Sequence, residues 1–302
     1  MLSGRLFWLL RRDLKRGWSA AYHDYKTKSR IAEWSWPFWK QTPQNVPVHV
    51  LTGKEDWELC AWMLASWFHF TEETWRIFIH DDGTLPEAAR GLFKNLFPIA
   101  RVISRDEADA RMDKALSALP FCHDYRNKHA LALKIFDMAA FTDAERFIVL
   151  DSDVLFFNHP PEIMQWAMNP AMECWFNEDV VERCLMTPDH ARTDLGVKLW
   201  RKVNTGLGLM VRAAIDLEFC ERALGETSIL KGDIARVEQT LFALCASKYG
   251  KGGLLPPTYE VTLNKEASED AISRHYVGAV RDRFYGEGMD RLRDILLAKV
   301  EA

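Results

Sequence analysis

The sequence predicts an α/β protein built on a doubly wound, mostly parallel central sheet with helices on both faces. Two observations predict this fold. Short apolar strands alternate with helices from about residue 48 onward, which is typical of a parallel sheet that is covered on both sides. The chain has 302 residues, of which 48% are hydrophobic and 27% charged, an ordinary balance for a globular protein with a large core. In such sheets, ligands bind beyond the carboxyl ends of the strands.

The apolar periodicity gives each element an approximate place. A strand over 48–52 is followed by Gly53 and by a helix that continues to about residue 70. The other strands are expected at 75–80, 100–104, 146–150, 172–176 and 207–211, and the other helices at 86–96, 128–141, 213–224 and 233–249. Residues 105–127 and 180–202 are expected to be variable loops.

Residues 1–45 differ from the rest of the chain and are predicted to form a basic, Trp-rich extension of the main domain, residues 46–302. Their net charge is +6, whereas the remainder carries −10, and nine of the twelve tryptophans lie at or before Trp75. A helix is expected over 2–19 and an irregular linker over 34–47. Basic residues together with tryptophans are typical of an interfacial anchor, so peripheral membrane contact is one hypothesis. A helix packed on the main domain is the other.

Composition and targeting signals favour a cytoplasmic protein, with the inner face of the membrane as a further possibility for its location. The apolar run Leu6–Leu10 is too short for a signal peptide, and no stretch of about 18 apolar residues is present. The six cysteines form no C-x-x-C pair, which favours reduced thiols over disulfides or metal ligands. A pI near 6.2 argues against nucleic acid as a partner.

The sharpest chemical feature is Asp151-Ser152-Asp153, at the end of the apolar strand 146–150. Burying an unpaired carboxylate costs several kcal/mol, so two of them beside a buried strand call for a cation or strong donors. A hard divalent ion with oxygen ligands, completed by diphosphate oxygens, meets that need. A surface turn with two acids is the alternative, which the apolar residues on both sides disfavour.

Two segments carry a resemblance to a known family. The D-x-D at 151–153 resembles that of glycosyltransferases with the GT-A fold. His275-x-x-Gly278-x-x-Arg281 resembles the C-terminal H-x-x-G-x-x-K of family 8, the glycogenin-like and lipopolysaccharide galactosyltransferase-like enzymes. Here Arg281 replaces the Lys, and the usual following Pro-Trp is missing. Arginine keeps the fixed charge and adds bidentate geometry for phosphate.

The resemblance implies a GT-A-like catalytic domain and a donor site. It implies Mn²⁺ or Mg²⁺ held by Asp151, Asp153 and His275, with Arg281 on the diphosphate. It also assigns sugar-pocket and catalytic roles to an N-[ST]-G segment and to an acidic-Gln pair. The further donor-binding and catalytic candidates are Asn204, Gly206, Glu238, Gln239, Lys134, Thr52, Gly53, Asp82, Ser152 and Gly278.

Each of these candidates also has a structural interpretation. Asn204 to Gly208 could be a tight turn into a strand, and Glu238 could be a helix-start acid that interacts with the positive end of the helix dipole. Lys134, one or two turns into the helix before the D-x-D strand, could lie on a solvated face. Glycine allows backbone to approach a ligand closely, and an amide offers both a donor and an acceptor, which favours the functional interpretation.

The predicted function is transfer of a sugar from a nucleotide-diphosphate sugar, with a UDP-sugar as the favoured donor, to an acceptor hydroxyl. Retention at the anomeric carbon follows from the family resemblance alone; an inverting enzyme would need a base such as Glu238. A carbohydrate or glycoconjugate is the expected acceptor, bound by the loops 105–127 and 180–202. The alternatives are a nucleotidyltransferase, whose glycine- and lysine-rich loop is poorly represented at Thr52–Asp56, and a non-catalytic nucleotide-sugar-binding protein.

Overall fold

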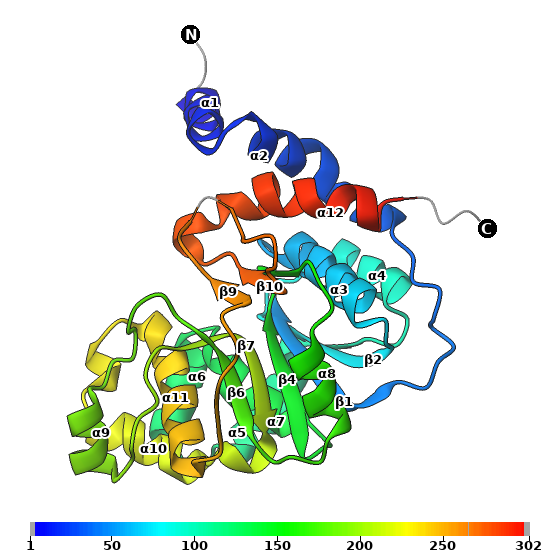
Figure 1. Cartoon of the computed structure of the whole chain (residues 1–302). Helices are drawn as coiled ribbons and strands as arrows, with labels where there is room; N and C mark the ends of the chain where they lie inside the picture. Colours follow the sequence, from blue (N-terminus) through cyan, green and yellow to red (C-terminus); the bar gives the residue numbers. More distant parts are fainter. Residues whose placement is uncertain (1–3, 265, 299–302) are drawn as a thin grey trace.

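The computed structural model describes residues 4–264 and 266–298, and it confirms the predicted α/β fold (Figure 1). A seven-stranded sheet has the strand order β3-β2-β1-β4-β7-β6-β8. All of its neighbouring strands are parallel except β7, which runs antiparallel to both β4 and β6. The strands are β1 (Gln44–Thr52), β2 (Trp75–Asp81), β3 (Arg101–Ile103), β4 (Arg146–Asp151), β6 (Cys174–Glu178), β7 (Val203–Val211) and β8 (Gly252–Leu254).

Helices cover both faces of this sheet and create two apolar cores. One core lies under α3 (Trp57–Thr71), α4 (Glu87–Leu96) and α8 (Pro161–Met168). The other lies on the opposite face, which Figure 1 shows covered by a second group of helices. These are α5 (Arg105–Ala115), α6 (Pro120–Lys128), α7 (Ala132–Phe141), α10 (Leu217–Glu226) and α11 (Val237–Tyr249), with α9 (Pro188–Leu195) beyond them.

Several predicted boundaries were wrong for identifiable reasons. Residues 105–127 are not a loop, because Ser104 caps α5 by accepting a hydrogen bond from the backbone N–H of Glu107, an S-x-x-E capping signature. The helix expected at 128–141 begins only at Ala132, since α6 ends at Lys128 and His129 is extended. The strand expected at 207–211 begins at Val203, so the segment that holds Asn204 lies inside β7 rather than in a turn.

A second, three-stranded sheet was not predicted. It has the order β5-β10-β9 and consists of β5 (Val154–Phe156), β9 (Tyr259–Val261) and β10 (Ser273–His275). Strands of three residues are too short to show a periodic pattern, which explains why sequence reasoning missed them. β10 runs antiparallel to β5, with His275 opposite Val154. This pairing brings the C-terminal part of the chain to the strand end that carries the D-x-D motif.

The N-terminal residues fold against the C-terminal helix α12 (Met289–Leu296), as Figure 1 shows above the sheet. The helix predicted over 2–19 is divided by Gly17, which has a φ of 93°, into α1 (Gly4–Arg16) and α2 (Trp18–Tyr22); residues 2 and 3 lie outside the described part. Ser19 and His23 both hydrogen-bond to Asp290, at 2.6 and 2.7 Å. The extension is therefore attached to the end of the chain that also carries His275.

The tryptophans of the first 45 residues divide into two groups. Trp34 and Trp36 lie in the same core as α3 and are 5% and 7% exposed. Trp8 and Trp18 are 59% and 78% exposed. The segment predicted as an irregular linker is thus packed against the core, whereas α1 and α2 present aromatic side chains to the outside. Among the described residues, no helix combines the length and apolarity that crossing a bilayer requires.

Two buried histidines make the stability of the fold sensitive to acid. His49 in β1 contacts His80 in β2 at 2.9 Å and Thr142 at 2.9 Å. Burial lowers the pKa of His80 to about 3 and the pKa of His49 well below its usual value. As the pH falls, the two histidines of the unfolded chain, with a pKa near 6.5, become protonated before those of the folded protein do. Protonation therefore favours the unfolded chain, and the free energy of unfolding should fall as the pH drops below about 6.5.

We expect a loss of about 2 kcal/mol per histidine between pH 7.5 and pH 5. Urea titrations at both pH values measure it. His80→Gln should unfold more easily at pH 7.5 but should show about half of the pH-dependent loss. An unchanged pH dependence in this variant would mean that other groups are responsible.

Candidate active site

The candidate site forms where β4 ends and β5 begins. Asp151 is the last residue of β4, and Ser152 and Asp153 make the turn into β5. Pairing of β10 with β5 places His275 beside this turn, and the backbone N–H of Tyr276 donates to the carbonyl oxygen of Asp153 at 2.9 Å. The two motifs that lie more than 120 residues apart in the sequence are thus joined by backbone hydrogen bonds.

Asp151, Asp153 and His275 form a group that fits a divalent cation. Nε2 of His275 lies 3.2 Å from Oδ1 of Asp153 and 3.8 Å from Oδ2 of Asp151, and one ligand atom of each lies within 4.8 Å of the others. Ligands at adjacent corners of an octahedron with bonds of ~2.1 Å are about 3 Å apart. Two carboxylates and an imidazole suit Mn²⁺ well and Mg²⁺ acceptably.

Asn204 fixes the orientation of the His275 ring. Its Oδ1 accepts from Nδ1 of His275 at 2.8 Å, so Nδ1 keeps its proton, and Nε2, which faces the two aspartates, is the nitrogen that binds a metal when it gives up its proton. The amide of Asn204 is itself held, because its Nδ2 donates to Asp179 at 3.1 Å and its Oδ1 also accepts from the N–H of Gly206 at 3.0 Å. This is the hydrogen-bonding support that a metal-binding histidine usually has.

Gly206 allows the His275 ring to lie against β7. A Cβ added at this position would lie 2.2 Å from Nδ1 of His275. We expect Gly206→Ala to displace the ring and to weaken Mn²⁺ binding by about 10–100-fold, the effect usual for lost support of a metal ligand. Isothermal titration with Mn²⁺ measures it. Gly91→Ala, where a Cβ meets nothing within 4 Å, is the control; equal affinities of the two variants would contradict the prediction.

Lys134 forms a buried ion cluster behind the aspartates. Its Nζ lies 2.7 Å from Oδ1 of Asp151 and 3.1 Å from Oε1 of Glu238, and it donates to the carbonyl of Thr205 at 3.2 Å. Burial alone would lower the pKa of Lys134, but Asp151 and Glu238 raise it above its usual value. Burial raises the pKa of Glu238 against the opposing effect of Lys134. Lys134 is only 2% exposed, so it does not lie on a solvated helix face.

Arg281 reaches the site from the C-terminal segment. It pairs with Asp56 at 2.8 Å and lies 3.7 Å from Asp153. Asp56, at the start of α3, was not among the predicted residues. Its position three residues after Gly53 at a helix start was the available signal, since acidic residues are common there. Arg281 therefore already neutralises carboxylates where the resemblance implies a diphosphate contact.

A cavity of about 170 Å³ joins most of the predicted donor-site residues. The structure places eight of them in its lining: Thr52, Gly53, Asp82, Lys134, Asp151, Ser152, Asp153 and Arg281. Leu51, Asp56, Ala130 and Leu131 line it as well and were missed. Gly53 leaves room for the Asp82 carboxylate, since an added Cβ would lie 2.2 Å from one of its oxygens.

The remaining candidates do not line this cavity. Asn204, Gly206, Glu238 and His275 lie behind it in the network described above. Gln239 follows Glu238 in α11 and is half-buried, and Gly278 is exposed, with nothing within 4 Å of an added Cβ. The structure thus brings most predicted residues together but leaves Gln239 and Gly278 apart from the cavity.

Comparisons with known proteins were made by sequence and by structure. No protein-family model matches the chain, and no curated protein matches it. Among solved structures, the bifunctional glycosyltransferase WbbM superimposes with a TM-score of 0.52 at 11% identity, over 82% of this chain and 49% of WbbM. The chain has the GT-A fold.

Two further GT-A structures resemble the chain less closely by superposition. Mouse xyloside xylosyltransferase 1 matches 78% of this chain and 98% of its own, at 13% identity and a TM-score of 0.47. The galactosyltransferase LgtC, in a complex with donor and acceptor sugar analogues, matches 77% of this chain and 87% of its own, at 14% identity and a TM-score of 0.48. The candidate site lies at the carboxyl end of β4 in this GT-A sheet.

The charge of the site favours a bound cation. Two cationic side chains, Lys134 and Arg281, face five carboxylates at and behind the cavity, a net charge of −3 when His275 is neutral, as a metal ligand must be. Burial raises the pKa of Asp153, but His275 and Arg281 hold it below its usual value, so this aspartate is ionised. A divalent ion would offset most of the excess negative charge before a diphosphate adds its own.

Proposed function

We propose that the protein is a metal-dependent glycosyltransferase that moves a sugar from a UDP-sugar to a hydroxyl of a carbohydrate or glycoconjugate acceptor. The observation that carries the proposal is the joining of Asp151, Asp153 and His275 into one group with Mn²⁺-ligand geometry, at the edge of a cavity that Arg281 also lines. The GT-A fold, shared with WbbM, agrees with it. A nucleotidyltransferase would use a glycine- and lysine-rich loop after β1, and Thr52–Asp56 is a poor version of one.

The proposed donor site divides into three parts. Asp151, Asp153 and His275 hold Mn²⁺ or Mg²⁺, and a cation there supplies positive charge opposite the departing diphosphate. Arg281 contacts the diphosphate after leaving Asp56, and its planar fork allows two hydrogen bonds. Thr52, Gly53 and Asp82 contact the nucleoside, and Asp151 and Ser152 lie beside its ribose. Gly206 leaves room for the His275 ring, and Gly278 supplies exposed backbone that a donor can approach closely.

The sugar lies, in this proposal, near Asn204, Lys134 and the Glu238-Gln239 pair. Lys134 remains charged between Asp151 and Glu238, so it offsets charge on the donor without moving a proton. Glu238 is held by Lys134 and accepts from the hydroxyl of Thr205 at 3.2 Å, a poor arrangement for a base that must take a proton from an acceptor. This favours retention of configuration at the anomeric carbon.

Donor binding and turnover test the proposal. UDP-glucose, UDP-galactose, UDP-N-acetylglucosamine and UDP-xylose are each added with Mn²⁺ or with EDTA, and the unfolding temperature and UDP release are measured. At least one donor should raise the unfolding temperature with Mn²⁺ and release UDP slowly by hydrolysis. No stabilisation by any of them would contradict the proposal. Stabilisation without UDP release, also when acceptor sugars are added, would favour a non-catalytic binding protein.

We further propose that α1 binds the surface of an anionic membrane. Four apolar side chains near it are more than half exposed: Phe7 63%, Trp8 59%, Leu14 67% and Trp18 78%. Arg11 and Lys15 are exposed beside them, and residues 1–45 carry a net charge of +6. Exposed aromatic residues with flanking cations are typical of helices that lie in the interface of a bilayer. A division into an extension of residues 1–45 and a catalytic domain of residues 46–302 agrees with this role.

Vesicle flotation of the full chain tests the membrane proposal. Binding is expected to vesicles with phosphatidylserine, to weaken as salt is raised, and to be lost in Phe7→Ser/Leu14→Ser. Met168→Ser, which removes a side chain that is 71% exposed on α8, should float like the unchanged protein. Absence of flotation with anionic vesicles, or equal flotation of both variants, would rule out membrane binding through α1.

A further inference from the structure

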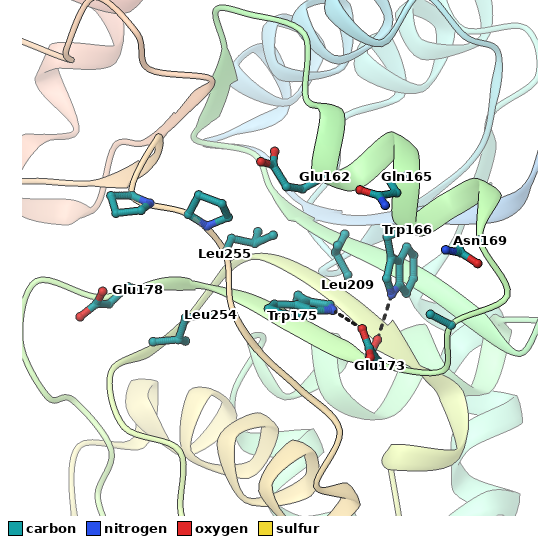
Figure 2. Close-up of a pocket in the computed structure, with 13 residues that line it drawn as sticks. Glu162, Gln165, Trp166, Asn169, Glu173, Trp175, Glu178, Leu209, Leu254 and Leu255 are labelled. Atoms are coloured by element: carbon teal, nitrogen blue, oxygen red, sulfur yellow. Dashed lines mark hydrogen bonds between the residues drawn. The ribbon is translucent and has the colours of Figure 1, made fainter.

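A larger cavity lies on the face of the sheet that carries α8. It has a volume of about 610 Å³, within the range of ligand-binding pockets. Figure 2 shows it bounded by α8 on one side and by the segment around Leu254 and Leu255 on the other. Trp175 of β6 and Leu209 of β7, which are paired in register, form its floor. No residue of this cavity also lines the smaller one.

Trp175 offers a flat apolar platform to this cavity. Its indole N–H donates to the carboxylate of Glu173 at 3.2 Å, which fixes the ring in place (Figure 2). Gly253 pairs with Trp175 in register, and a Cβ there would touch the six-membered ring at 3.4 Å. Because residue 253 has no side chain, the ring remains open to a ligand. An open, fixed indole is a surface on which the C–H face of a sugar ring can stack.

The polar groups of the cavity accept hydrogen bonds and repel anions. Glu162, Glu173 and Glu178 line it together with the amides of Gln165 and Asn169, whereas no Lys, Arg or His does. Each carboxylate has one partner within the protein: Tyr259, Trp175 and Lys202, respectively. Carboxylates accept several hydrogen bonds, so they remain available to sugar hydroxyls. The negative charge of the three carboxylates repels phosphorylated and acidic ligands, so the UDP-sugar itself is not expected to bind here.

One end of the cavity points toward the candidate active site. Glu178 follows Asn177, which pairs in register with Asn204, the residue that holds His275. Trp175 lies three residues before Glu178, or roughly 10 Å along the strand. The segment around Leu254 and Leu255, which forms the opposite wall, continues into β9. β9 runs beside β10, the strand that carries His275. An extended ligand that is bound at Trp175 can therefore reach the metal-binding edge of the sheet.

We propose that this cavity is a subsite for an uncharged saccharide, the part of the acceptor that precedes the sugar carrying the reacting hydroxyl. The inference rests on the proposed glycosyltransferase function and deepens it by naming an extended, neutral glycan as the acceptor class. Sugar rings stack on Trp175, and their hydroxyls donate to Glu162 and Glu173. The subsite binds and positions the acceptor and takes no part in bond breaking.

The test is binding of the full chain to a printed array of neutral and acidic oligosaccharides, followed by titration of the best ligand. Two variants at Gly253 differ in how much of the Trp175 ring their new side chain covers. Gly253→Ala places a methyl group in ordinary contact with Trp175 and should bind almost normally. Gly253→Leu extends over the ring and should weaken binding at least tenfold. Mn²⁺-dependent UDP release without acceptor should be the same in both variants, because Gly253 lies outside the donor site.

Each outcome is decisive. Neutral glycans bound by the unchanged chain and by Gly253→Ala, but not by Gly253→Leu, support the subsite. Binding of acidic glycans alone, equal binding by both variants, or no retention of any glycan would overturn it. If the unchanged protein binds neutral glycans but releases no UDP from any donor, the proposed glycosyltransferase function is contradicted, and the cavity remains supported as a saccharide-binding site.

Discussion

Asp153→Asn is expected to lower Mn²⁺-dependent UDP release from the donor by about 10³-fold. The substitution keeps the size of the side chain but removes the charge that faces Nε2 of His275 at 3.2 Å. A cation that is lost or misplaced no longer stabilises the leaving diphosphate, and losses of this size follow removal of such stabilisation. Steady-state UDP release with saturating Mn²⁺ measures the effect.

The same variant separates a catalytic role from a structural one. Asp153 is 8% exposed, and in the absence of metal its charge is paired with His275 and Arg281, so removing it should lower the unfolding temperature modestly and leave the chain folded. The increase in unfolding temperature on adding Mn²⁺ should disappear. Asp113→Asn, at a side chain that is 61% exposed, is the control for a lost carboxylate. Unchanged UDP release in Asp153→Asn would remove this residue from the mechanism.

Lys134→Met should lower the free energy of unfolding by about 3–5 kcal/mol. Methionine fills a similar volume, but the substitution leaves the buried carboxylate of Glu238 and the partly exposed carboxylate of Asp151 without their cation. Chemical denaturation at pH 7.5 without metal measures the loss. The effect is larger than for a surface ion pair, because Lys134 and Glu238 are each 2% exposed.

A double-mutant cycle tests the cause of this loss. In Lys134→Met/Glu238→Gln, one uncompensated carboxylate is removed with the lysine, so the double variant should be more stable than the sum of the single losses predicts. A coupling free energy of at least about 1 kcal/mol is expected. Additive losses would mean that Lys134 stabilises the fold through packing instead of charge.

The residues of the candidate site were largely predictable because their chemistry is unusual for their position. Two carboxylates after a buried strand need a cation, and this argument requires no structure. Eight of the predicted residues line one cavity because the carboxyl ends of parallel strands meet at the same edge of the sheet. Gln239 and Gly278 were assigned by resemblance alone, and the structure does not place them in that cavity.

Other parts could not be predicted because they depend on contacts between distant segments. β10 is three residues long and is a strand only through its pairing with β5 and β9. The position of Arg281 beside both Asp56 and Asp153 is invisible in the sequence for the same reason. Tryptophan composition likewise did not reveal that Trp34 is buried whereas Trp18 is exposed. Composition gives the number of such side chains, and only packing decides which of them face solvent.

Pulsed EPR of the chain with Mn²⁺ and UDP tests the central claim most directly, because it reports the ligands of the ion. One Mn²⁺ per chain is expected, with a ¹⁴N coupling from the imidazole of His275 and a ³¹P coupling from the diphosphate. His275→Gln should lose the nitrogen coupling, and Asp153→Ala should lose the bound ion. A bound Mn²⁺ without nitrogen coupling, or one that persists unchanged in Asp153→Ala, would contradict the assignment of the metal site.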